Sequence, residues 1–156
     1  MRRPVEVVLD TNAVRYFIEN PEHGNRLCEL IDAGCHDLVL PNIRSEVEGR
    51  LGTDFIGIIG AFRSRLRSKL ITPSPSEDYI KGVEKRVARI GHRLRLPKNK
   101  DGLVAVSAIY RAEVMRRNSV IVSSDPNFLN ELARVLKSFN VEVIEPKDLI
   151  DRLKDP

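Results

Sequence analysis

Short apolar runs alternate with longer stretches of helical spacing along this 156-residue chain. Four runs rich in β-branched residues, at 5–9, 37–40, 120–122 and 141–144, predict buried strands. Between them, apolar residues recur at the three- and four-residue spacing of helices. Strands that alternate with helices predict a parallel sheet with right-handed crossovers. We therefore expect an α/β fold in a single domain over 1–156, a three-layer α/β/α sandwich whose central parallel sheet has four to five strands.

Helix signals divide the intervals between these strands. Gly34 is placed to end one helix and Pro41 to begin another. The letters SPSE at 74–77 predict a capping box with Pro75 at the first helical position. Further helical patterns run over about 55–70, 80–94, 101–117, 126–139 and 146–153. No strand signal separates the helical patterns within about 53–96, so we expect this segment to form a helical arm inserted in the sandwich.

The basic charge of the chain is concentrated in that arm. The whole chain has 26 Lys and Arg residues against 22 Asp and Glu, a net charge of +4, whereas 61–100 alone has 12 against 3. Lys81, Lys85, Arg89 and Arg93 recur every four residues, which stacks like charges on one helix face. Such a stripe is either a solvated helix face or a binding surface for a polyanion such as nucleic acid.

Acidic residues stand where the predicted strands end. Asp10 directly follows the first strand, and Asp125 ends the short polar segment that follows the third strand. Asp101 begins the helix that precedes the third strand. Glu46 lies one turn into the helix that follows the second strand. Because the carboxyl ends of parallel strands meet at one edge, we expect these four acids to converge there. Crowded carboxylates repel unless a cation neutralises them, and hard oxygen ligands favour Mg²⁺ or Mn²⁺.

Each acid also has a purely structural interpretation. Asp125, followed by a proline, is a good helix N-cap, and Asp101 is a favourable acid at a helix N-terminus. Glu46 could pair with Arg50 one turn later. Asp10 resists this interpretation best, because it lies at the end of a central strand, at the edge of the apolar core.

Four motifs resemble those of the PIN domains, a family of metal-dependent ribonucleases that includes the toxins of many prokaryotic toxin–antitoxin pairs. The resemblance spans 5–144, and its motifs read VLDTN at 8–12, PNIRSEV at 41–47, KDGLVAVSA at 100–108 and VSSDPNF at 122–128. It implies a metal-dependent endoribonuclease that hydrolyses RNA phosphodiester bonds with Mg²⁺ or Mn²⁺. The acids that it implies as catalytic residues and metal ligands are Asp10, Glu46, Asp101 and Asp125. It further implies that Asn12 and Ser124 hydrogen-bond these acids.

The sequence departs from the family pattern at two places. Family members often carry a second Asp two positions after the fourth acid, where this chain has Asn127. An amide oxygen can orient a metal-bound water but adds no charge, so the sequence leaves open whether one or two metal ions bind. Glu48 lies close enough to Glu46 that the motif alone assigns the second acid.

The resemblance and the charge pattern together suggest the partners. RNA would be held along its backbone by the basic residues before the third acid: Lys81, Lys85, Arg89, Arg93, Arg95, Lys98 and Lys100. The family implies a homodimer and, for a toxin, an antitoxin protein. No apolar run approaches the roughly 20 residues that cross a bilayer, and two cysteines suit a reducing compartment, so we expect a cytoplasmic protein without a membrane span.

Other interpretations stay open at this stage. The fold could serve as an RNA-binding scaffold in ribosome or RNA processing, with Asn127 marking weakened metal binding. A phosphoacceptor or phosphatase of the α/β class would need a second acid close to Asp10, where the chain has Thr11 and Asn12. A zinc site would have to use ligands whose spacing matches no usual zinc module: His23, Cys28, Cys35 and His36.

Overall fold

The computed structural model describes residues 4–41, 60, 62–71, 73, 75–90 and 100–154. For residues 100, 101, 115, 127 and 131 it describes the backbone alone. The predicted helix after Pro41, with Glu46 and Glu48, therefore lies outside the described residues, as do Arg93, Arg95 and Lys98. Among the helices that are described, none is long and apolar enough to cross a membrane.

The predicted parallel sheet is confirmed and has five strands in the order β3-β2-β1-β4-β5. Their bounds are Val5–Leu9 for β1, Asp37–Val39 for β2, Leu70–Ile71 for β3, Asn118–Val122 for β4 and Val141–Ile144 for β5. The central strand β1 is buried along its whole length, as expected for a strand covered on both faces. The chain order reverses between β1 and β4, which makes this pair the switch point of the sheet.

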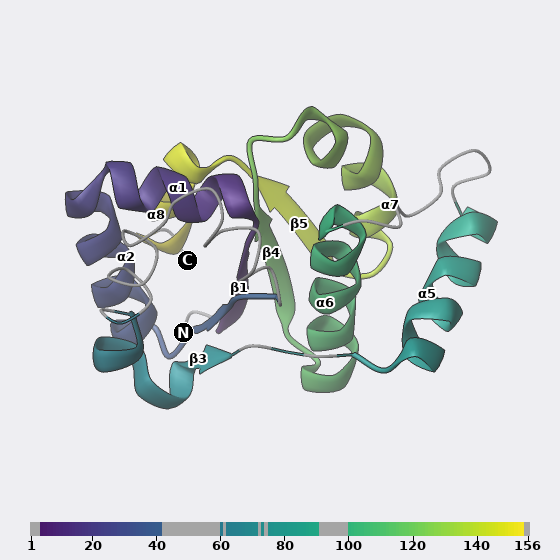
Figure 1. Cartoon of the computed structure of the whole chain (residues 1–156), viewed down its shortest axis with the longest axis horizontal. Coiled ribbons are helices and arrows are strands. Elements are labelled where there is room, and N and C mark those ends of the chain that lie inside the picture. The colour runs from purple at the N-terminus through teal and green to yellow at the C-terminus, as the bar shows by residue number, and fades with distance from the viewer. Residues whose placement is uncertain are drawn as a thin grey trace.

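Helices cover both faces of the sheet and complete the three layers (Figure 1). One face carries α1 (Thr11–Glu19), α2 (Pro21–Ala33) and α8 (Pro146–Lys154), which pack against one another. The other face carries α6 (Lys100–Met115), the π-helix η2 (Asn127–Leu132) and α7 (Ala133–Lys137). On that side α5 (Glu77–Ile90) lies beyond α6, at the end of the molecule (Figure 1).

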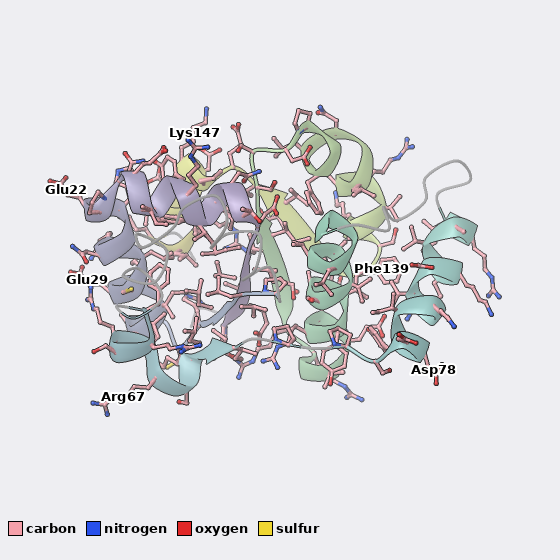
Figure 2. All side chains as sticks on the ribbon, viewed as in Figure 1. Glu22, Glu29, Arg67, Asp78, Phe139 and Lys147 are labelled. Carbon is pink, nitrogen blue, oxygen red and sulfur yellow. The ribbon has the colours of Figure 1, made fainter. Side chains whose placement is uncertain are left out.

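The expectation of one continuous basic arm over 53–96 is wrong. Strand β3 joins the edge of the sheet between the two helical patterns, because Leu70 and Ile71 pair with β2 rather than continuing the helix. The helical residues 62–66 and the 3-10 turn η1 (Arg67–Lys69) precede it on the α2 side. There Lys69 donates to the backbone and carboxylate oxygens of Asp32, both at 3.0 Å. The two basic segments consequently lie at opposite ends of the molecule, as the positions of Arg67 and Asp78 show (Figure 2).

Helix α5 begins two residues later than predicted and docks on α6 through polar side chains. The Oγ of Ser76 accepts the N–H of Tyr79 at 3.2 Å, so Ser76 is the cap and Pro75 precedes it. Glu113 of α6 accepts the Tyr79 hydroxyl at 3.2 Å and pairs with Arg86 at 2.6 Å. Burial and the Glu113 charge raise the pKa of Tyr79, which keeps its hydroxyl a donor. One face of α5 therefore packs against α6, and the other face is exposed to solvent.

The largest surprise of the fold is a buried charge cluster at the amino edge of the sheet. Glu6 of β1 has no exposed surface, and both of its carboxylate oxygens accept from the guanidinium of Arg111 at 3.3 Å. Its neighbour in the register is Asp37 of β2, which Arg117 contacts at 2.9 Å. Arg117 also approaches Glu6 at 3.6 Å. Two carboxylates and two guanidinium groups thus balance in charge around the fully buried Glu6, with the Arg117 side chain 34% exposed at the rim of the cluster.

Glu6→Gln should change how stability depends on pH. Burial raises the pKa of Glu6 above its ordinary 4.5, and Asp37 adds to the rise while Arg111 opposes it. Between 4.5 and that raised value the folded protein holds a proton that the unfolded chain has released, so the stabilisation from Glu6 falls as the pH rises. Urea unfolding of both proteins from about pH 4.5 to about pH 8 should show the wild-type advantage shrinking with pH. An advantage that grows with pH would contradict the raised pKa.

Candidate functional site

The switch point of the sheet brings the ends of β1 and β4 together. Leu9 pairs with Val122 in the register of the two strands, and the N–H of Asp10 donates to the carbonyl of Val122 at 3.1 Å. The residues that follow the two strands, Asp10 and Ser123, therefore leave the sheet side by side. This is the place where open parallel sheets bind their ligands.

Asp10 is buried at this edge and held by three donors. It is 4% exposed and forms the N-cap of α1, with Oδ1 accepting the N–H of Thr11 at 2.8 Å. Its Oδ2 accepts the hydroxyl of Ser123 at 2.8 Å and the amide of Asn12 at 3.3 Å. These contacts fix both oxygens of the carboxylate in orientation before any ligand arrives. The contact between Asn12 and Asp10 is the one that the sequence predicted.

Ser123 is the centre of a hydrogen-bond network that joins the carboxylate of Asp10 to the backbone of Asp125. Its hydroxyl donates to Asp10 and accepts the N–H of Asp125 at 3.0 Å and the amide of Asn12 at 3.3 Å. The residue has no exposed surface. Because one buried hydroxyl contacts both acidic residues, a shift of either strand end would cost a hydrogen bond.

The chain turns sharply after Asp125 into an unusual helix. The carbonyl of Asp125 accepts the N–H groups of Phe128 and Leu129, both at 3.1 Å, which starts the helical segment at this residue. The predicted helix over 126–139 then proves to be the π-helix η2 followed by the short helix α7. π-Helical turns are rare and are frequent at functional sites.

The structure places the predicted site residues in three groups. Asp10, Asn12 and Asp125 meet at the carboxyl edge, as expected. The backbone of Asp101 lies in the first turn of α6, and that of Asn127 begins η2; their side chains are outside the described part, as is the whole of Glu46. Ser124 is exposed, and its described role is a backbone N–H that donates to the Asn12 oxygen at 3.0 Å.

The motif comparison singled out Ser124 and passed over the neighbouring serine. Residues alternate between the two faces of a strand, so only one of two adjacent serines at a strand end can point back to Asp10. That residue is Ser123. The signal available in the sequence was its position next to the apolar run of β4, which makes it the more buried of the two.

The described acids suit a hard divalent cation by their chemistry. Asp10 and Asp125 offer carboxylate oxygens, and Asn12 adds an amide, with no sulfur or imidazole in the network described above. Neutral donors hold the Asp10 carboxylate without taking its charge. Within the described residues no group of three or more His, Cys, Asp or Glu side chains converges, so a complete ligand set would also need Asp101 or Glu46.

The zinc alternative finds no support in the described geometry. His23 contacts the Tyr16 hydroxyl at 2.7 Å on the surface, while Cys28 is buried and Cys35 is exposed. His36 accepts the backbone N–H of Val5 at 3.0 Å, which gives it a structural role at the start of β1.

Comparison with known proteins identifies no relative. No family model, no curated protein and no solved structure matches this chain. The resemblance to PIN domains stays a prediction based on the four motifs.

Ser123→Ala should lower the free energy of unfolding by about 1–3 kcal/mol, because it removes one donor to the buried Asp10 carboxylate and the acceptor of the Asp125 N–H. The matched control is Ser124→Ala, an exposed neighbour whose backbone contact survives the change and whose effect should stay within about 0.5 kcal/mol. Urea unfolding of the two variants measures both. Equal effects would show that the network does not depend on the buried hydroxyl.

Proposed function

We propose that this protein is a metal-dependent endoribonuclease of the PIN type. The observation that supports this best is the pair Asp10 and Asp125, bridged by the buried Ser123 hydroxyl at the switch point between β1 and β4. The hydroxyl contacts the carboxylate of Asp10 and the backbone N–H of Asp125. Capping of α1 by Asp10 does not require the added contacts of Ser123 and Asn12 to its carboxylate. The order of the four motifs along the chain adds a second, independent support.

In the proposed site, Asp10 and Asp125 would hold Mg²⁺ or Mn²⁺ together with Asp101 and Glu46. Such an ion, when bound, lowers the pKa of a coordinated water and polarises a phosphoryl oxygen. The chain's own contribution is orientation. Ser123 and Asn12 hold the Asp10 carboxylate in place, so that little reorganisation is needed when a phosphodiester arrives.

The RNA backbone would lie against the exposed face of α5. Lys81, Lys85 and Arg89 are exposed there at four-residue intervals, and none of them has an ion-pair partner among the described residues. Arg86 is not available in the same way, because it pairs with Glu113 and lies over the Phe139 ring at 4.9 Å from its centroid. Helix α5 runs toward the same end of the sandwich as the strand ends that carry the acids (Figure 1).

We further propose a cytoplasmic protein that forms a homodimer, with an antitoxin protein as its partner if it acts as a toxin. Retention of the fold as an RNA-binding scaffold is the alternative, and the observation that favours it is Asn127 in place of a second acid.

Asp10→Asn should abolish cleavage, because the amide keeps the shape of the carboxylate but removes the charge that attracts a cation. A mixed RNA pool incubated with Mn²⁺ should be cleaved by the wild type, and the variant should fall to the level that the wild type shows with EDTA. The control is Asp151→Asn, an exposed acid on α8, which should cleave like the wild type.

Two results would overturn the nuclease. Cleavage that survives both Asp10→Asn and EDTA would contradict a metal-dependent reaction. RNA retention without cleavage and without a Mn²⁺ signal in calorimetry would instead support the scaffold.

Replacing Lys81, Lys85 and Arg89 together by Gln should weaken RNA binding and reduce its salt dependence. Each phosphate contact to a single strand contributes about 0.7 to the slope of log affinity against log salt, so three lost contacts should lower it by about 2. Filter binding of a single-stranded RNA at several salt concentrations measures the slope. Cleavage of a saturating amount of RNA should be little changed.

The matched control for this variant is Arg63→Gln with Arg67→Gln, two exposed basic residues on the α2 side of the molecule. Their loss should leave the slope unchanged. If this control lowers the slope as much as the α5 variant does, the RNA lies on the other end of the molecule.

A further inference from the structure

Helix α6 connects the two ends of the central strand. It crosses the sheet against β1 and β4 and runs antiparallel to them, since it is the crossover that leads into β4. Near its carboxyl end Arg111 contacts Glu6, at the start of β1. In its first turn is Asp101, at the edge where β1 ends in Asp10.

The spacing along the helix matches the spacing along the strand. Arg111 and Asp101 are ten residues apart, which is about 15 Å along an α-helix. Glu6 and Asp10 are four residues apart and on the same face of β1, which is about 13 Å along a strand. When Arg111 lies over Glu6, Asp101 therefore arrives level with Asp10. A slip of α6 by one turn would move the backbone of Asp101 about 5.4 Å along the strand direction relative to Asp10.

The buried apolar residues of α6 are of mixed size. Ala105, Ala108 and Ala112 let the helix approach closely but make shallow ridges, while the larger buried side chains are Val104, Val106 and Ile109. Further polar contacts between α6 and the sheet are described: the Ser119 hydroxyl of β4 donates to the carbonyl of Ala108 at 3.1 Å, and Arg111 also approaches Asp37 of β2 at 3.9 Å. The contact that holds the helix at two points is the bidentate one between Arg111 and Glu6, whose side chains are 12% and 0% exposed.

We propose that Glu6 and Arg111 are positioning residues for the metal site at the opposite edge of the sheet. Their ion pair sets the register of α6 along β1 and thereby places Asp101 beside Asp10. This inference rests on the proposed metal-dependent function. Specifying one register is the best attested use of buried ionic groups, which add little net stability compared with apolar side chains of similar size.

The test replaces the ion pair by apolar side chains, Glu6→Leu with Arg111→Met, which leaves Asp37 its contact with Arg117. This double variant should unfold at the same urea concentration as the wild type or a higher one, since apolar replacement of a buried pair is often stabilising. It should nevertheless bind Mn²⁺ about tenfold more weakly in calorimetry, as when a group that orients a ligand is lost. In an Asp101→Asn background the same replacement should cost no further affinity.

The ion pair of Glu142 with Arg152, between β5 and α8, provides the control. Changing both residues to Gln should leave Mn²⁺ affinity unaltered. Wild-type affinity in the Glu6→Leu, Arg111→Met variant, or an equal loss in the Asp101→Asn background, would overturn the positioning role while the metal site stands. A wild type that gives no Mn²⁺ signal would overturn the metal site itself. If the double variant unfolds, Arg111→Lys keeps the charge without the two-point contact and should show the same loss of affinity.

Discussion

The pairing of β1 with β4 is the contact on which the candidate site depends. Its register sets Leu9 opposite Val122, and the backbone bond from Asp10 to Val122 carries the pairing one residue past the strand. Two polar residues from segments more than a hundred positions apart in the chain are thereby forced together at the edge of the core. The Ser123 hydroxyl then satisfies both Asp10 and Asp125, so the same hydrogen bonds that end the two strands also assemble the site.

Much of this arrangement could be predicted from local patterns. Buried parallel strands are apolar on both faces, so 5–9 and 141–144 were visible as short β-branched runs and match β1 and β5. Residues that follow such runs lie at the carboxyl edge of a parallel sheet, and this rule predicted the positions of Asp10 and Asp125. Helix α8 could also be predicted from a local pattern, because an amphipathic repeat after a proline defines both its start and its buried face.

What could not be predicted depends on partners distant in the chain. Strand β3 has two residues, too few for any periodic signal, and Leu70 fits the helical register of the residues before it. Glu6 looks like an interruption in an apolar strand until Arg111 is folded against it. The choice between Ser123 and Ser124 depends on which one faces Asp10, and that is decided by where the pairing with β1 ends.

Contacts that form only in the folded protein also determine how many of the basic residues can bind a partner. Of the described basic residues between 61 and 90, Lys69 is bound to Asp32, and Arg65 donates to the backbone and side chain of Asn25, which ties them to α2. Arg86 is used to attach α5 to Glu113. The net charge of the sequence counts these residues equally with those that face solvent. A guanidinium already paired with a carboxylate, however, contributes less to the attraction for phosphate. Fewer basic side chains are therefore exposed without a described ion pair or hydrogen bond than the charge count suggests: within the described part of 61–90 they are Lys81, Lys85 and Arg89 on α5, and Arg63 and Arg67 on the α2 side.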